Sequence, residues 1–178
     1  MRKIFFIAAF MLCFLVNCTA SAAQNQNIGF VIVGGVEFKT SDYYKIVQSV
    51  IKPLSGEQIV VGNDLQTRYK KYWLKRGFIG EQPPQQSDLI NFTNMSGCKK
   101  VVYVIISDAV IDKHNSSNHR EKSRISIQLD AYLCTSTEVV DMFAASDEES
   151  SKGSDLRARR GAFKKCLTEI SKDLNNLL

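Results

Sequence analysis

The stretch Lys99–Ser107, KKVVYVIIS, constrains the fold more than any other part of the chain. Its residues from Val101 onward, with Tyr103 in the middle, suit a buried and pleated backbone. A short run with apolar side chains on both faces must be covered on both sides, because neither face can be left in water. We therefore expect this segment to be an interior strand of a sheet, with the other elements arranged around it.

The first 23 residues have the pattern of a secretory signal peptide. Two basic residues precede the apolar run Ile4–Val16, which is short for a membrane span, and small residues follow up to Ala23. The pattern predicts cleavage after Ala22 or Ala23 and an exported protein, periplasmic or secreted. An uncleaved amino-terminal anchor is the less favoured alternative.

Cys18 offers a second way to process the leader. Bacterial lipoproteins are cleaved directly before a cysteine, which is then lipidated, and Leu15 and Val16 fit that pattern. Asn17 departs from it, since a small residue is expected before the cysteine. A lipid anchor at Cys18 would tether the protein to a membrane and is the less favoured interpretation.

The remaining residues, 24–178, are predicted to form one domain, large enough to bury a core. Loss of Arg2 and Lys3 with the leader lowers the formal net charge from +5 to +3. This mildly basic balance gives no reason to expect nucleic acid as a partner. No later apolar run reaches membrane-spanning length, so at most peripheral membrane contact is expected.

Periodicity and capping residues predict alternating helices and strands in this domain. The expected strands are Ile28–Val36, Gln58–Val61, the stretch described above, Ile125–Leu133 and Val139–Phe143. The expected helices are Tyr43–Lys52, Leu65–Arg76, a short helix capped by Ser87 or Asp88, and Asp155–Leu178. The order β-α-β-α-α-β-β-β-α indicates an α+β fold with a mixed β-sheet flanked by helices.

Three segments are expected to lie outside regular structure or to depart from it. The polar region Ala109–Arg124 is predicted to be a loop, and the acidic, serine-rich run Ala144–Ser154 a mobile segment. Gly34 and Gly35, near the end of the first strand, predict a bulge or a close approach of backbone.

The helix around Arg68–Arg76 combines aromatic and basic residues. Leu65, Tyr69, Tyr72 and Trp73 recur at helical spacing, which favours an inward aromatic stripe with a solvated basic outer face. The alternative is that the basic residues bind an envelope protein or an anionic surface. The candidate partner-binding residues are Arg68, Lys70, Lys71, Lys75 and Arg76.

His114 and His119 lie in the predicted loop, near Asp108 and Asp112. Two imidazoles and a carboxylate could hold a metal, but the spacing does not orient the two rings, so a polar loop is the favoured interpretation. No nucleophile, zinc or phosphate-loop motif is present. We therefore expect a non-enzymatic protein with no cofactor or metal; the alternative is a secreted hydrolase or metal-dependent enzyme using this loop.

Cys98, Cys134 and Cys166 are the cysteines beyond the leader. Their odd number allows one disulfide with a free thiol, or three free thiols. Each lies in or beside an apolar segment, which favours buried small side chains.

The second half of the chain resembles small envelope domains of bacteria. The resemblance spans residues 88–178 and rests on Gly97, Val101–Val104, the alternation Ile125–Tyr132, Val139–Val140, and a helix with Ala158, Ala162, Phe163, Leu167 and Ile170. The similar domains are those of the curli-secretion lipoprotein, of lipoprotein activators of penicillin-binding proteins, and of the TolB amino-terminal region. The turn at Thr135–Glu138 departs from their usual hairpin turn.

This resemblance implies a mixed sheet flanked by helices, a non-enzymatic role and binding to envelope partners. No functional residue carries over from these domains. The resulting expectation is an exported bacterial envelope protein that acts as a binding or accessory module. A mainly structural cell-surface component that associates with itself is a further alternative.

Overall fold

The computed structural model describes residues 27–178, except for 54–55, 79–82, 116–120 and 153. The expected leader, residues 1–23, lies outside the described residues. Among the described residues, no helix has both the length and the apolar character that a membrane crossing requires.

A mixed five-stranded sheet forms the centre of the domain, in the order β2-β1-β3-β4-β5. β1 (Asn27–Val33) is parallel to β2 (Gln58–Val61) and to β3 (Lys100–Asn115), whereas β4 (Glu121–Cys134) is antiparallel to β3 and to β5 (Val139–Lys152). The KKVVYVIIS stretch is therefore the middle strand, as predicted. The α+β class and the predicted order of elements are also confirmed.

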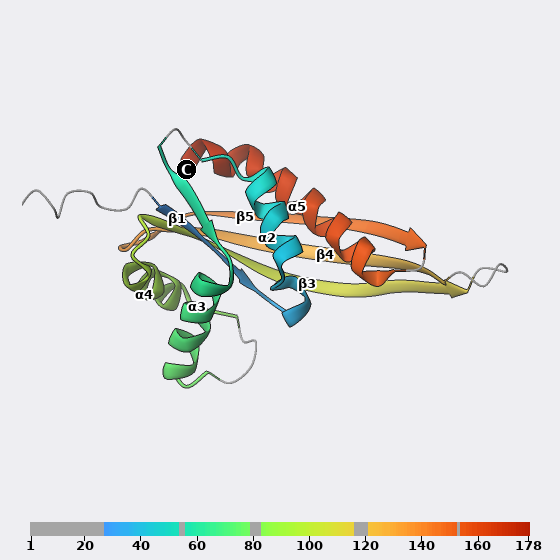
Figure 1. Cartoon of the computed structure of the whole chain (residues 1–178), viewed down its shortest axis with the longest axis horizontal. Helices are drawn as coiled ribbons and strands as arrows, with labels where there is room; N and C mark the ends of the chain where they lie inside the picture. The colour runs from blue at the N-terminus through green and yellow to red at the C-terminus, as the bar shows by residue number, and fades with distance from the viewer. Residues whose placement is uncertain (1–26, 54–55, 79–82, 116–120, 153) are drawn as a thin grey trace, which may run out of the picture.

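The helices cover the two faces of the sheet in pairs (Figure 1). A 3₁₀ turn, η1 (Val36–Phe38), leads into α2 (Ser41–Val50), which packs beside α5 (Asp155–Leu177) on one face. The other face carries α3 (Asn63–Lys75) and α4 (Gln86–Ser96) at one end of the sheet. The long strands β3, β4 and β5 extend beyond α3 and α4, where α5 covers them on its own face (Figure 1).

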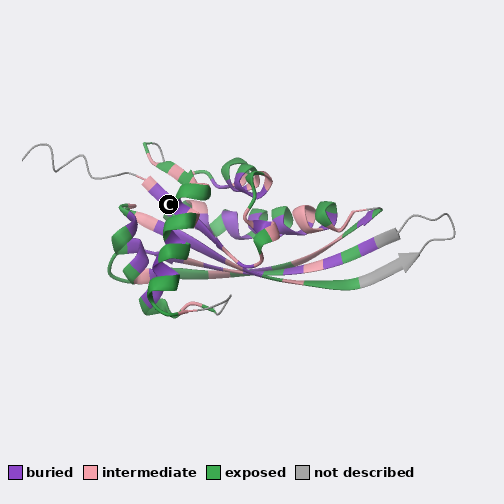
Figure 2. Ribbon diagram, turned by 60° about the horizontal axis from the view of Figure 1, so that its bottom comes forward, coloured by how far each residue is buried: buried purple, intermediate pink, exposed green. Residues whose placement is uncertain are grey.

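The face beneath α2 and α5 contains the larger core. Alternate strand residues point into it, such as Phe30 of β1, Val104 of β3 and Leu129 of β4, all at most 1% exposed. From α5, Phe163 packs edge-on against Tyr43 of α2, with ring centroids 5.1 Å apart. Buried positions lie along the sheet and on the inner sides of the helices (Figure 2), as expected for amphipathic elements.

The face beneath α3 and α4 has a smaller and more aromatic core. Tyr69 of α3 contacts Phe92 of α4 and Tyr103 of β3, with centroid separations of 5.1 and 5.8 Å. The Tyr103 hydroxyl donates to the Leu89 carbonyl at 2.8 Å and lies 2.8 Å from the Thr93 hydroxyl. The predicted inward stripe of α3 is thus confirmed, and polar bonds hold α4 on the sheet.

The predicted loop Ala109–Arg124 is wrong over most of its length. β3 continues to Asn115 and pairs with β4 from Glu121, with a bulge at Ile111. The polar sequence misled because these strands have α5 on one face only, so polar residues on the other face remain in water.

The predicted mobile segment Ala144–Ser154 is also wrong, since β5 continues to Lys152. Lys165 of α5 lies 2.6 Å from Glu149 and 3.6 Å from Asp147, and Arg124 of β4 pairs with Glu148. The acidic run is therefore strand, because basic groups on neighbouring elements offset its charge.

Neither Ser87 nor Asp88 caps α4. The helix begins two to three residues earlier, with Gln85 as its N-cap residue, so Asp88 lies inside the first turn and is 1% exposed. Its carboxylate accepts from Arg76 Nε at 3.1 Å and from the Tyr72 hydroxyl at 3.3 Å. Asp88 joins the two helices instead of starting one.

Candidate functional site

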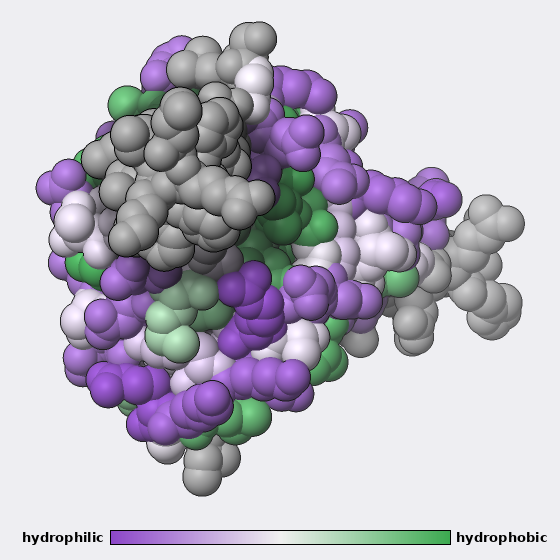
Figure 3. Space-filling view, turned by 60° about the vertical axis from the view of Figure 1, so that its left-hand side comes forward, coloured by the Kyte–Doolittle hydropathy of each residue, from purple (hydrophilic) through white to green (hydrophobic). Residues whose placement is uncertain are grey.

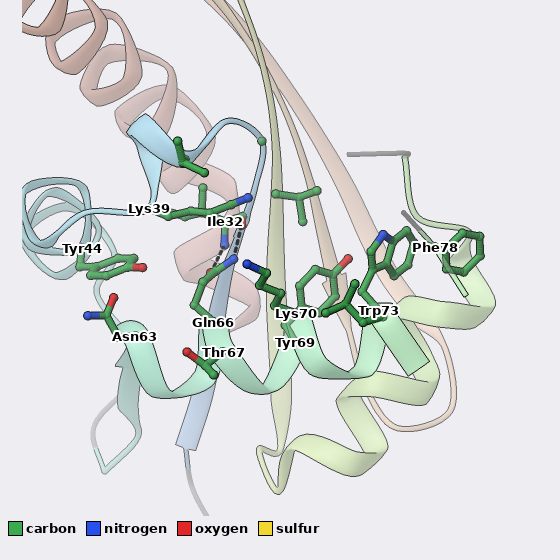
Figure 4. A pocket seen from close by; sticks show the side chains of 14 residues that line it. Ile32, Lys39, Tyr44, Asn63, Gln66, Thr67, Tyr69, Lys70, Trp73 and Phe78 are labelled. Atoms are coloured by element: carbon green, nitrogen blue, oxygen red, sulfur yellow. Dashed lines mark hydrogen bonds between the residues drawn. The ribbon is translucent and has the colours of Figure 1, made fainter. Parts of the chain in front are cut away.

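A cavity of about 320 Å³ lies between α3, the end of β1, η1 and the start of α2 (Figure 4). Its volume is at the lower end of the range for small-molecule sites. Residues from these elements and from the segments joining them line it: Ile32, Val33, Gly34, Val36, Lys39, Tyr44, Asn63, Gln66, Thr67, Tyr69, Lys70, Trp73, Leu74 and Phe78.

The cavity forms where two parallel strands have unequal lengths. Pairing of β2 with β1 ends at Phe30 and Val61, but β1 continues to Val33. The backbone of Ile32 therefore has no strand partner on that side. The Gln66 side chain takes the place of one: Ile32 N–H donates to Gln66 Oε1 at 3.1 Å, and Gln66 Nε2 donates to the Ile32 carbonyl at 2.6 Å. The carboxyl ends of parallel strands are common ligand sites in α/β sheets.

Gly34 brings backbone close at the edge of this cavity. A Cβ there would lie 3.1 Å from the backbone oxygen of Ile106, and φ is +152°, a value that side chains disfavour. The close approach predicted for this glycine is confirmed.

The lining changes in polarity along α3. Asn63, Gln66 and Thr67 lie in its first turns, whereas Trp73 and Leu74 lie in its last. Phe78, just after the helix, stacks on Trp73 with ring centroids 4.3 Å apart. The cavity thus has a polar end and an aromatic end (Figure 4).

Two tyrosines of the lining carry buried hydroxyls that have no hydrogen-bond partner among the described residues. They belong to Tyr44 and Tyr69, which are 8% and 6% exposed. Burial raises the pKa of both phenols, and the charge of Asp88 raises that of Tyr69 further. Both stay neutral at physiological pH, and an unpaired buried hydroxyl carries a free-energy cost that a bound acceptor can offset.

Lys39 and Lys70 supply the charge of the lining, and their side chains extend toward the middle of the cavity in Figure 4. No aspartate or glutamate is among the described residues that line it. Glu37 is close in sequence but acts on the other face of the sheet, where its charge raises the pKa of Tyr43 and Arg159. Lys70, which pairs with no carboxylate among the described residues, thus gives the lining a positive charge.

The five basic residues predicted to bind a partner divide into two groups. Arg68 and Arg76 hold α3 and α4 together: Arg68 donates to the carbonyls of Met95 and Ser96 at 3.1 and 2.8 Å, and Arg76 pairs with Asp88. These two guanidinium groups contribute to packing within the chain.

Lys70, Lys71 and Lys75 are exposed and pair with no carboxylate among the described residues. Only Lys70 lines the cavity. Binding of a partner to the five residues stays a prediction.

Sequence reasoning did not find Lys39, Tyr44, Gln66 or Thr67 as site residues. Gln66 and Thr67 have no local signal, because their roles depend on where β2 stops beside β1. The glycines at 34 and 35 were the available signal that backbone comes close here.

The candidate metal loop is not tested by the structure. His119 lies outside the described residues, and only the backbone of His114 is described, as part of β3. Within the described part of the chain, no three histidine, cysteine, aspartate or glutamate side chains group as metal ligands would.

The three cysteines are free, which favours the interpretation as buried small side chains for Cys134 and Cys166. Burial raises the pKa of Cys134 to about 12 and that of Cys166 to about 11. Their thiolates are scarce at neutral pH, so neither thiol is a good nucleophile.

The sequence matches no protein-family model and no curated protein. Among solved structures, the lipoprotein GNA1162 from Neisseria meningitidis is similar at 9% identity and a TM-score of 0.43, over 84% of this chain and 98% of that one. The PelC dodecamer from Paraburkholderia phytofirmans is similar at 7% identity and a TM-score of 0.39, over 85% and 89%. Rare lipoprotein B from Shewanella oneidensis matches at 6% identity and a TM-score of 0.31, over 83% and 89%.

These three are bacterial proteins, two of them named as lipoproteins. At such identities and TM-scores the likeness supports no conclusion about family or function. The resemblance to the curli-secretion, synthase-activator and TolB domains stays a prediction.

Proposed function

We propose that this chain is an exported bacterial envelope protein whose single domain binds a small ligand at the α3 cavity without transforming it. The observation that carries this is the combination, in one cavity, of an aromatic end with two buried tyrosine hydroxyls that have no hydrogen-bond partner among the described residues. Ligand sites are typically apolar hollows with a few convergent polar groups.

The chemistry of the lining favours binding over catalysis. Its described residues include no carboxylate, imidazole or thiol that could take or give a proton at neutral pH. Its two phenols have raised pKa values and act as hydrogen-bond donors. Its lysines can attract an anion but have no neighbouring base in the lining.

Export is supported by the leader pattern of residues 1–23, with processing after Ala22 or Ala23 and the Cys18 lipid anchor as the alternative. Lys71 and Lys75 remain exposed beside the cavity, where an envelope protein or an anionic surface could contact them. The domain would then serve as an accessory module that senses or carries a ligand at the envelope.

Native mass spectrometry of the full chain, recovered gently from an envelope fraction, tests this function. We expect a bound molecule on the wild type and loss of that mass in Thr67→Trp, which fills the cavity from α3. Lys71→Trp is the matched control, since Lys71 is exposed on the same helix and does not line the cavity.

Two results would count against the proposal. One is a wild-type protein without bound mass, and the other is a bound mass that survives in Thr67→Trp. The same spectra give the mature amino terminus, which decides between cleavage near Ala23 and lipidation at Cys18.

A further inference from the structure

We infer that the cavity takes an amphipathic organic anion, a medium-chain acyl carboxylate, with its headgroup at Lys70 and its chain along Trp73. The inference rests on the proposed binding function and names its ligand class. Charge, polarity along the helix and exposed apolar surface each lead to it.

The charge of the lining selects an anion. Lys70 contributes a cation to the cavity and has no carboxylate partner among the described residues. With no acid among the described lining residues, a cationic ligand would be repelled by Lys70, and a neutral ligand would form no ion pair with it.

The polar groups lie where a headgroup would need them. Thr67 and Lys70 lie three residues apart on α3, hence on one face, and both line the cavity. The unpaired hydroxyl of Tyr44 comes from the opposite side of this region (Figure 4). A carboxylate accepts several hydrogen bonds at once, so it can satisfy donors from separate elements.

The apolar end of the cavity suits the acyl chain of such a ligand and not a second polar group. Beyond Lys70 the lining consists of Trp73, Leu74 and Phe78. Val36 and Leu74 are 79% and 56% exposed, among the larger apolar residues left in water, and both belong to this cavity. On the face drawn in Figure 3, hydrophobic residues form patches in a mostly hydrophilic surface.

The length of this path suits a chain of medium length. From Lys70 to Leu74 the helix advances about 6 Å at 1.5 Å per residue, and Phe78 extends the apolar lining beyond it. An acyl chain laid along it would cover Leu74 and Val36 while its headgroup stays at Lys70. Removing this apolar surface from water supplies the binding free energy, and the ion pair supplies selectivity.

The protein provides its own probe, because Trp73 is the single tryptophan of the chain and lines the cavity. Octanoate, its neutral analogue octanamide and its cationic analogue octylammonium can be titrated into the mature full chain by calorimetry. Octanoate brominated at its far carbon should quench Trp73 fluorescence by contact.

We expect octanoate to bind more tightly than octanamide, and octylammonium to bind least. Lys70→Gln should weaken the binding of octanoate roughly fivefold, to the affinity of octanamide, and should leave the affinity of octanamide unchanged. Lys71→Gln, which removes the same charge from the next position, should leave all three affinities unchanged. Of the two probes expected to bind more tightly, added salt should weaken the binding of octanoate and leave that of octanamide unchanged.

Equal binding of octanoate and octanamide, or tightest binding of octylammonium, overturns the inference that an anion is selected. Binding without quenching of Trp73 by the brominated probe overturns the placement of the chain. If no probe binds, the ligand class is wrong. The bound mass lost in Thr67→Trp then decides separately whether the cavity binds any ligand, so the two failures are distinguishable.

Discussion

The two faces of the sheet are built in different ways. Beneath α2 and α5, Tyr43, Phe163 and Leu129 are fully buried. Beneath α3 and α4, Tyr69, Tyr72 and Trp73 keep 6–8% of their surface exposed, and polar bonds through Asp88 tie the helices together. The first face is the larger core, and the cavity opens beside the second, where α3 meets the end of β1.

This difference separates stability from binding. A close-packed face tolerates little loss of volume, because neighbouring side chains cannot collapse into the space. A face held by a few polar bonds around an incompletely filled cavity can admit a ligand with a smaller loss of packing free energy than a close-packed face. The four predictions that follow test this division, from the largest expected effect to the smallest.

Phe163→Ala should destabilise the whole domain by about 3–5 kcal/mol, because it removes a fully buried ring in contact with Tyr43. Urea unfolding followed by circular dichroism measures the change. Leu156→Ala, at a position that is 42% exposed on the same helix, is the control and should change stability by less than about 0.5 kcal/mol. A loss below about 1 kcal/mol for Phe163→Ala would show that the α5 face is not the main core.

Asp88→Ala should cost about 1.5–3 kcal/mol, since it breaks the bonds from Arg76 and Tyr72 to a buried carboxylate. The loss should be local: amide hydrogen exchange should quicken in α3 and α4 before α5 is affected. Asp64→Ala, on an exposed acid in the first turn of α3, serves as the control. Equal quickening in α5 would mean that the two faces unfold together.

Gln66→Leu should cost about 1–2 kcal/mol, because the Ile32 N–H and carbonyl both lose their partner. Exchange of the Ile32 amide should quicken while the amide of Val31, on the β3 side of the same strand, stays protected. Gln66→Glu keeps an acceptor but loses the donor, so its stability should lie between that of the wild type and that of Gln66→Leu. Unchanged exchange at Ile32 would remove Gln66 from the account of this site.

Tyr43→Phe should have the smallest effect at neutral pH, near zero or slightly stabilising, because the buried hydroxyl has no partner among the described residues. Burial raises the pKa of Tyr43 to about 12. Between pH 10 and 12 the folded state therefore holds this proton while the unfolded state releases it. The contribution of the neutral Tyr43 phenol to the free energy of unfolding is fully present below pH 10. It falls as pH rises above 10, by at most about 1.4 kcal/mol per pH unit.

Unfolding at several alkaline pH values measures this slope. The free energy of unfolding of Tyr43→Phe should fall less steeply with pH than that of the wild type. Comparing the two proteins at each pH removes the contribution of the buried thiols, which has the same sign. Identical slopes would contradict the raised pKa.

The sequence predicted the fold better than it predicted the site. The run at Val101–Ser107 and the alternation from Ile125 to Leu133 mark strands because burial on one or both faces selects apolar residues at fixed spacing. The extensions of β3, β4 and β5 were missed because one face of these strands is in water, where composition resembles that of a loop. Lys165 on α5 and the acids of β5 offset each other across elements, and no local pattern shows this.

The site was harder to predict, because its residues come from elements far apart in the chain. Lys70 was found through the density of basic residues, but the same pattern also selected Arg68 and Arg76, which turned out to hold α4. Tyr44 and Gln66 acquire their roles only when α2 and α3 meet the free end of β1. Nothing within either helix distinguishes them from neighbouring polar or aromatic positions.

The strand β5 also has a consequence for the protein's behaviour in solution. As the last strand in the sheet order it has no neighbouring strand on its outer side within the described part of the chain, and such an edge can recruit strands from other molecules. Here it carries three consecutive acids, Asp147, Glu148 and Glu149. Lys165 and Arg124 of the same chain offset their charges, but a strand from a second copy would still have to pack beside charged side chains, and charged residues on an edge strand disfavour such pairing.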